Sequence, residues 1–233
     1  MKLYSKAARH LVAVDCIIFG YDILEKEIKL LLYKRSIKPA KGKWSLAGGF
    51  VEDDESLDEA AYRILRKITG LDSVYLKQSH AYGDVKRDPG DRVISVSYFS
   101  LIALRNIKKE IAEKNGVHWR SLSRLPNLIF DHHEMVSRAL SSLQAQVKVN
   151  PVGFELLPDK FTLVQLQCLY EAIYLRKMDK RNFRKKILLM NILEKLDEKE
   201  TVTSKKGAYY YRFHEEKYDK LKKSGFYFNL DVN

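Results

Sequence analysis

Two acidic side chains, Glu52 and Glu55, stand just ahead of a predicted helix in this sequence. Carboxylate oxygens are the ligands that Mg²⁺ takes in proteins, and bound Mg²⁺ can promote the cleavage of a pyrophosphate. The helix has no carboxylate at Ile64, Lys67 and Ile68, three positions that share one helical face. Two loop carboxylates alone make a poor metal site. We therefore expect no metal, no cofactor and no catalytic residue.

Local signals set the limits of this helix. Ser56 followed by Glu59 is a capping box, and Gly70 suits a left-handed C-terminal cap. A helix is therefore predicted from Leu57 to Thr69. An acid near a helix start is favoured by the helix dipole, which gives Glu55 a structural role as an alternative to residual metal binding.

The composition is that of a water-soluble chain of one large or two modest domains, with 233 residues, 45% hydrophobic content and a net charge of +12. It contains no apolar run that could cross a membrane and no signal-peptide core at its start. Cys16 and Cys168 lie in apolar patterns typical of buried, reduced cysteines, so we expect a cytoplasmic protein. The basic balance is compatible with a polyanionic partner.

The first part of the chain alternates predicted strands and helices. Leu11–Phe19 and Lys29–Arg35 indicate a strand pair, and Arg92–Ile102 alternates apolar and polar residues as a half-buried strand does. Asp131–Val147 has the pattern of a helix. Proline and glycine then cluster at residues 149–153, so we predict a linker there between two domains, 1–147 and 154–233.

A basic helix-turn-helix is predicted after the linker. Apolar residues at helical spacing run from Thr162 to Leu175, and Asp179 offers an N-cap for a second helix that reaches Met190. Residues 176–186 hold seven basic side chains and one acid. Opposite the apolar stripe of the second helix lie candidates for contact with base edges and phosphates, namely Lys180, Arg181, Asn182, Arg184 and Lys185.

A basic hairpin is predicted downstream. Residues 201–203 and 208–213 are assigned to its strands, and Lys205 and Lys206 lie at its tip, where a wing would meet DNA phosphate. The alternative is a solvated basic helix followed by an ordinary hairpin. The helix-turn-helix spacing, the basic outward face and the basic hairpin together favour DNA binding.

The stretch from Gly49 to Leu71 resembles a Nudix box, G-x5-E-x7-R-E-U-x-E-E-x-G-U with U a bulky aliphatic. The chain matches it at Gly49, Glu55, Arg63, Leu65, Gly70 and Leu71. The three metal-holding glutamates of the box correspond here to Ile64, Lys67 and Ile68. The resemblance implies an α/β fold, a Nudix-like α/β/α sandwich with a mixed sheet, that has lost hydrolysis.

The second half resembles the C-terminal domain of Nudix-related transcriptional regulators, the NrtR group, at residues 161–167, 170–172 and 179–186. Members join a Nudix-like effector domain to a winged helix and act as dimeric DNA binders, usually repressors. The resemblance implies a homodimer, a double-stranded palindromic operator and a small-molecule effector, with no membrane partner. It implies a regulator and not an enzyme.

The loss of all three helix carboxylates makes a phosphorylated, metal-assisted ligand less favoured. Within the group this points to the AraR type, which responds to L-arabinose and controls carbohydrate use. Two alternatives stay open: an ADP-ribose-responsive repressor of NAD metabolism, and an active Mg²⁺-dependent ADP-ribose or sugar-nucleotide pyrophosphatase, with metal held by Glu52, Glu55 and Asp88. By analogy of position with the Nudix fold, the effector is expected to meet Arg35, Trp44, Phe50, Glu52, Arg92 and Tyr98.

Overall fold

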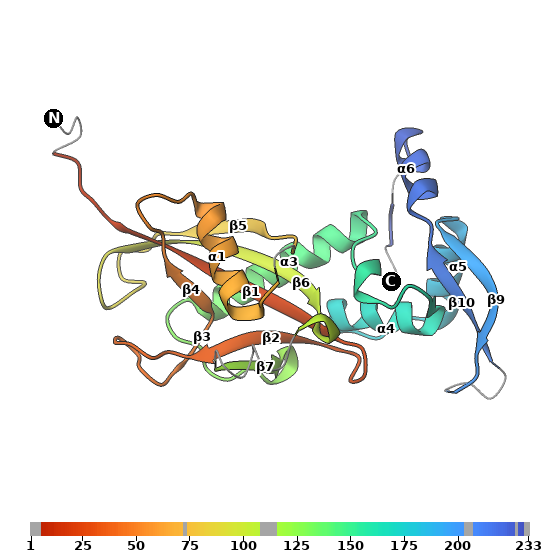
Figure 1. Ribbon diagram of the computed structural model, residues 1–233, viewed down its shortest axis with the longest axis horizontal. Helices are drawn as coiled ribbons and strands as arrows, with labels where there is room; N and C mark the ends of the chain where they lie inside the picture. Colours follow the sequence, from red (N-terminus) through yellow and green to blue (C-terminus); the bar gives the residue numbers. More distant parts are fainter. Residues whose placement is uncertain (1–5, 72–73, 108–115, 203–206, 227, 231–233) are drawn as a thin grey trace. The chain divides into compact units, whose positions relative to one another are not determined.

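The computed structural model describes residues 6–71, 74–107, 116–202, 207–226 and 228–230. These residues form two compact units (Figure 1). The first unit comprises the chain up to Phe19, Lys29–Leu101 and Asn106–Ala139. The second comprises Gly20–Ile28, Ile102–Arg105 and the chain from Leu140 onward.

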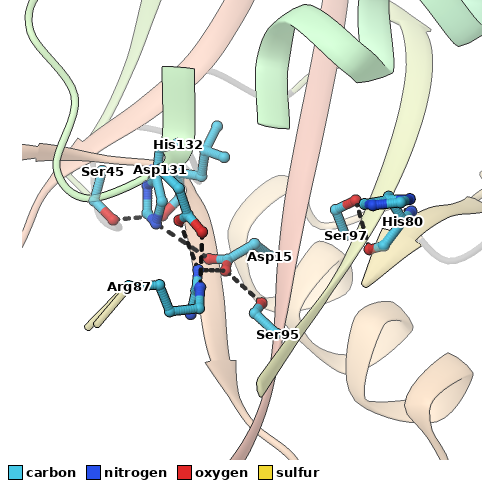
Figure 2. Close-up of polar contacts among 9 residues, drawn as sticks. Asp15, Ser45, His80, Arg87, Ser95, Ser97, Asp131 and His132 are labelled. Carbon is cyan, nitrogen blue, oxygen red and sulfur yellow. Dashed lines mark hydrogen bonds and ion pairs between the residues drawn. The ribbon is translucent and has the colours of Figure 1, made fainter. Parts of the chain in front are cut away.

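A seven-stranded sheet is the centre of the first unit, with the strand order β3-β2-β1-β6-β5 and with β4 paired to β1 and β7 paired to β2. The pairs β1–β4, β2–β3, β2–β7 and β5–β6 are antiparallel. The hydroxyl of Ser97 spans the irregularity between β5 and β6, because it accepts from the amide of His80 at 3.2 Å and donates to its carbonyl at 3.1 Å (Figure 2). The strands are β1 (Leu11–Asp22), β2 (Glu27–Lys34), β3 (Trp44–Ser45), β4 (Ala47–Phe50), β5 (Lys77–Tyr82), β6 (Val93–Ala103) and β7 (Val117–Ser121).

Helices cover both faces of this sheet, as two neighbouring residues of β1 show. The thiol of Cys16 lies 3.8 Å from the carbonyl of Ala61 in α1 (Leu57–Thr69). Asp15 points toward His132, the first residue of α3 (His132–Val149). Successive side chains of a strand point to opposite faces, so α1 and the start of α3 lie on opposite sides of the sheet. The expected α/β/α arrangement is confirmed.

The capping signals predicted α1 correctly at both ends. The hydroxyl of Ser56 accepts from the amide of Glu59 at 3.3 Å, and the Glu59 carboxylate accepts from the amide of Ser56 at 2.7 Å. Gly70 has φ 71° and donates its amide to the carbonyl of Arg66 at 2.8 Å. A residue with a β-carbon is disfavoured in this left-handed conformation, which explains the glycine.

The winged helix in the second unit consists of three helices and a small sheet. The strand order is β8-β10-β9, and the core contains Tyr170, Phe183 and Ile187, which are at most 1% exposed. Phe154 stacks on Phe213 with ring centroids 4.4 Å apart. The elements are β8 (Phe161–Thr162), α4 (Leu163–Tyr174), α5 (Lys180–Leu189), β9 (Leu193–Glu200), β10 (Ala208–Phe213) and α6 (Glu215–Lys223).

The hairpin differs from its prediction in one strand. Residues 208–213 form β10 as predicted, but its partner is Leu193–Glu200, and Thr201 and Val202 follow the end of that strand. The assignment of a strand to residues 201–203 was therefore wrong at the first two, and the third lies outside the described residues. The charged run of β9 lacks a β pattern of its own, and its pairing with β10 makes it a strand. Every helix in the described ranges is too short or too polar to span a membrane.

Candidate functional site

Of the three α1 positions that would carry metal ligands in a Nudix hydrolase, the first packs against the protein here. Ile64 is only 5% exposed, and a β-carbon built on Gly49 would lie 3.2 Å from its Cδ1 atom. Lys67 is exposed and Ile68 is half-buried. Among the described residues, no group of three His, Cys, Asp or Glu side chains is placed to hold a metal ion. The side chains on this face are chemically unsuited to Mg²⁺, which requires oxygen ligands.

Glu55 is held by Arg63 of α1. The guanidinium donates from Nε to one carboxylate oxygen at 2.8 Å and from Nη2 to the other. The same carboxylate accepts from the amide of Glu52 at 2.9 Å. The hydrogen bond from Arg63 lowers the pKa of Glu55 to about 2. Both oxygens are thus used to tie the loop to the helix, a structural role that differs from the helix-dipole role considered for Glu55 from the sequence.

A cavity opens on the other face of the sheet, between β1, β4, the loop before β6 and the segment before α3. It encloses about 160 Å³. This is less than the roughly 300–1,000 Å³ of sites that enclose a drug-sized ligand whole, so the cavity fits one part of such a ligand. The side chains used below that line it are Asp15, Arg35, Phe50, Arg87, Phe130 and His132.

The inner wall of the cavity is a buried ionic network (Figure 2). Arg87 is 8% exposed and donates from Nε and Nη2 to the two oxygens of Asp131, at 2.8 Å each. Its Nη2 also lies 3.7 Å from Oδ2 of Asp15, which accepts a 2.6 Å hydrogen bond from Ser95. One cation thus faces two carboxylates, and the pairing offsets the cost of burying it.

His132 completes the network as a neutral ring. Its Nδ1 accepts from the amide of Leu46 at 3.1 Å, so the ring proton is on Nε2, which lies 3.7 Å from Oδ1 of Asp15. Burial lowers the pKa of His132, while the nearby aspartates act against this shift. The histidine therefore joins β1 to the start of α3 without adding a charge to the cavity wall.

Arg35 also lines the cavity, but unlike Arg87 it lies over an aromatic ring. Its guanidinium carbon lies 5.6 Å from the ring centroid of Phe130, and its Nε is buried without a hydrogen-bond partner among the described residues. Phe130 has φ 49°, a strained value for a residue with a β-carbon. A buried donor without a partner costs free energy, and Arg35 thus keeps hydrogen-bonding capacity that the described residues do not use.

The structure brings two of the six predicted effector residues to the cavity, Arg35 and Phe50. The other four are engaged elsewhere. Trp44 packs edge-on against His118, and Glu52 lies 3.5 Å from Arg63. The Nη1 of Arg92 donates to the carbonyl of Asp84 at 3.1 Å, and the hydroxyl of Tyr98 bonds to Asp58.

Sequence reasoning missed the residues that form the cavity wall. Asp15, Arg87, Asp131 and His132 come from three segments that are far apart in the chain. Arg87 directly precedes Asp88-Pro89-Gly90-Asp91, a turn-forming sequence with an acid on each side. This turn was the one local pattern in the sequence that could have drawn attention to Arg87. The pairing partner of Arg87, Asp131, is 44 residues away, and no local pattern indicates it.

The second unit carries the candidate DNA-contacting helix. In α5, Phe183 and Ile187 are buried, and the five predicted residues Lys180, Arg181, Asn182, Arg184 and Lys185 are all exposed. Asp179 caps the helix by accepting from the amide of Asn182 at 2.8 Å. Lys205 and Lys206 lie outside the described residues.

The turn between α4 and α5 is fixed by Glu171. One of its oxygens accepts from Gln167 at 2.9 Å and from the amide of Met178 at 3.0 Å. The other is 2.9 Å from the Lys177 ammonium. No sequence pattern indicated a role for this side chain, which sets where α5 begins.

A Nudix-type sheet followed by a winged helix defines a two-domain class, and comparisons with known proteins identify the family. The NUDIX domain model matches residues 9–139, and the model of the NrtR DNA-binding winged helix domain matches residues 153–213. Over 213 residues, the chain is 34% identical to the ADPR responsive transcriptional repressor NtrR of Acinetobacter baylyi, covering 90% of this chain and 84% of that protein. It is 35% identical over 136 residues to the ADP-ribose pyrophosphatase of Methanocaldococcus jannaschii, covering 58% and 76%.

Solved structures also resemble this chain in both domains. Shewanella oneidensis NrtR complexed with a 27mer DNA has a TM-score of 0.76 and 27% identity, over 94% of this chain and 99% of that one. The NUDIX domain of the same protein complexed with ADP ribose has a TM-score of 0.50 and 28% identity, over 60% and 92%. The chain belongs to the Nudix family and, through its second domain, to the NrtR-type regulators. The resemblance to the NrtR group is confirmed, and none of these relatives is named for L-arabinose.

Proposed function

We propose that this chain is an ADP-ribose-responsive transcriptional repressor whose Nudix domain senses the ligand without hydrolysing it. The domain limits stay those proposed from the sequence, 1–147 and 154–233. The single observation that supports sensing over hydrolysis is the face of α1, where Ile64 packs on Gly49 in a position that the box assigns to a metal-holding glutamate. The repressor of Acinetobacter baylyi, described as ADPR responsive, supports the choice of ligand.

In this proposal Arg35 is the residue that takes the anionic part of the ligand. Its guanidinium lies over Phe130 in the cavity lining, and no protein group among the described residues accepts a hydrogen bond from its Nε. Arg87 is less suited, because two aspartates already face it. Phe50, which is 48% exposed at the rim, offers an apolar surface to a base or sugar. The rest of the ligand would extend beyond the 160 Å³ of the cavity.

The DNA-binding role is assigned to the exposed residues of α5, acting in a homodimer on a palindromic operator. Two recognition helices related by a twofold axis read half-sites one helical turn, or a multiple of it, apart. The ligand releases DNA if it binds the DNA-free arrangement more tightly than the DNA-bound one.

Three measurements on the purified protein test the proposal. An operator is first selected from a random duplex pool, and its complex is then titrated with ADP-ribose and, separately, with L-arabinose. Release by ADP-ribose alone is expected. Release by L-arabinose alone would instead support the AraR type inferred from the lost carboxylates, and release by neither would contradict a sensor of either ligand.

The second candidate function is a Mg²⁺-dependent ADP-ribose pyrophosphatase, favoured by the 35% identity to the enzyme of Methanocaldococcus jannaschii. It would require Glu52, Glu55 and Asp88 to hold the metal, although Arg63 occupies both oxygens of Glu55. Assaying AMP release with Mg²⁺ and ADP-ribose decides between the two. Turnover of about 1 s⁻¹ or faster would establish the enzyme and contradict the sensor.

A further inference from the structure

The wing hairpin carries a group of three side chains that no role described above uses. The ammonium of Lys195 lies 3.6 Å from the ring centroid of Tyr209, and that of Lys199 lies 4.7 Å from the same centroid. All three residues are exposed. We call Lys195, Tyr209 and Lys199 the wing stack.

The strand register shows which face of the hairpin holds the stack. Lys199 is paired with Tyr209, and Lys195 is paired with Tyr211. Residues directly opposite each other in an antiparallel pair share a face. Tyr211 is 6% exposed and is also paired with Phe161, which is 1% exposed. The wing stack therefore continues the hairpin face that packs on the helices of the winged helix.

Two acidic side chains of the hairpin, Glu194 and Glu198, lie beside basic ones. Glu198 is bonded to Lys160, whose ammonium lies 5.2 Å from the ring centroid of Tyr210. Glu194 is directly opposite Arg212. Within the described residues, neither Lys195 nor Lys199 is in an ion pair. Glu194 and Glu198 thus have basic neighbours, whereas Lys195 and Lys199 have the ring of Tyr209 as theirs.

We propose that the wing stack is a contact site for the phosphate backbone of duplex DNA, located on the shaft of the wing. The proposal rests on the DNA-binding function proposed above and adds a site to it. Two like charges held at one ring repel each other. DNA phosphates relieve that repulsion when the two ammonium groups displace counterions condensed on the DNA. The ring fixes the two ammonium groups through cation–π attraction. Contacts to phosphate carry no sequence information, so the stack would contribute equally to all duplexes.

Close packing also holds the stack in shape. Gly207 has φ 71°, and a β-carbon there would lie 3.1 Å from Cδ and 3.3 Å from Cβ of Lys199. The stem of Lys199 therefore lies along the backbone of Gly207 at the start of β10. This limits where its ammonium can go and keeps it beside Tyr209.

The test measures binding to the selected operator and to a random duplex of equal length, over a series of salt concentrations. The variant is the double substitution Lys195→Gln with Lys199→Gln, and the matched control is Lys160→Gln on the opposite face. The double variant should bind both duplexes more weakly by the same factor. Its plot of log K against log salt should be shallower by about 1.8, since each phosphate contact contributes about 0.9. Lys160→Gln should keep the slope of the unmodified protein.

Further measurements separate the outcomes. Lys195→Arg with Lys199→Arg should restore the slope, and circular dichroism should show that all variants are folded. A double Gln variant with an unchanged slope, or with a loss confined to the operator, overturns the wing stack while the proposed repressor stands. If the unmodified protein binds DNA and is not released from it by ADP-ribose, the proposed effector is wrong. The salt slopes of the variants then still decide whether the wing stack contacts phosphate. An unmodified protein that binds no duplex at low salt overturns both.

Discussion

Gly49 and Ile64 are in such close contact that a β-carbon on the glycine would lie 3.2 Å from Cδ1 and 3.7 Å from Cγ1 of the isoleucine. In a Nudix hydrolase the second of these positions carries a carboxylate. Here it anchors α1 on β4 by apolar packing. The contact explains why the chain keeps the glycine of the box although it lacks the glutamates.

Ile64→Glu should therefore fail to create hydrolysis and should destabilise the protein. The carboxylate would enter a site that is 5% exposed, and burying a polar group without a partner costs about 1–3 kcal/mol or more for a charge. One added carboxylate also cannot replace a set of metal ligands. Thermal unfolding and AMP release with Mg²⁺ and ADP-ribose check both parts. Lys67→Glu, at an exposed position of the same helix, is the control for stability. Pyrophosphatase turnover by either variant would contradict the view that hydrolysis needs the whole set.

The Glu55–Arg63 pair should make the stability of the protein depend on pH, and the pKa of Glu55 gives the direction of that dependence. The pKa of Glu55 is lowered to about 2 in the folded chain, below that of an ordinary glutamate near 4.3. The contribution of Glu55 to stability is therefore fully present above the unfolded pKa and is lost as pH falls from about 4.3 toward 2. Glu55→Gln should unfold at lower temperature at pH 7 and show a weaker decline of melting temperature between pH 5 and pH 3. Parallel declines in the two proteins would show that the pair does not contribute.

Arg87 should be the most costly of the cavity residues to replace. Arg87→Met removes the cation between Asp15 and Asp131, and breaking one side of a buried ion pair costs about 3–5 kcal/mol. Lys86→Met, at the exposed neighbouring position, is the matched control and should stay within about 0.5 kcal/mol of the original. Urea unfolding measures both. Equal stability of the two variants would mean that the network does not hold α3 to the sheet.

How far the sequence predicted these features depended on whether their causes are local. The limits of α1 and the start of α5 follow from caps within three residues, and both were predicted correctly. The residues of β9 were not predicted as a strand, because β9 is a strand through its pairing with β10, which lies later in the chain. The cavity wall could not be predicted because Asp15, Arg87 and Asp131 meet only after folding. Trp44 was predicted to meet the effector by analogy of position with the Nudix fold, and the structure places its ring edge-on to that of His118.

Arg35 should determine ligand affinity without determining stability. Arg35→Ala removes a donor that has no protein partner at Nε, so folding should lose little. A hydrogen bond to a charged group contributes about 1.5–3 kcal/mol, so the dissociation constant for ADP-ribose should rise about 10- to 150-fold. Calorimetric titration measures this, with Arg138→Ala, at an exposed position of α3, as a matched loss of one arginine away from the cavity lining. Unchanged affinity in Arg35→Ala would remove Arg35 from the ligand site.

The recognition helix gives the sharpest distinction between reading bases and holding the backbone. Arg181 and Arg184 are exposed on α5 beside its capped start, and a side chain that pairs with a base edge contributes about 1–3 kcal/mol of discrimination. Arg181→Ala and Arg184→Ala should each lose affinity for the operator and relax discrimination at one half-site position. Lys77→Ala on β5 removes the same charge elsewhere and should leave operator affinity and discrimination unchanged. Lys205→Ala, at a position assigned to the wing tip from the sequence alone, should weaken binding to all sequences alike and reduce the salt slope by about 0.9. Gel shifts with the operator and its single-position variants resolve these cases. If the arginine variants lose affinity for every sequence equally, α5 holds only the phosphate backbone, because a lost base contact must depend on the base.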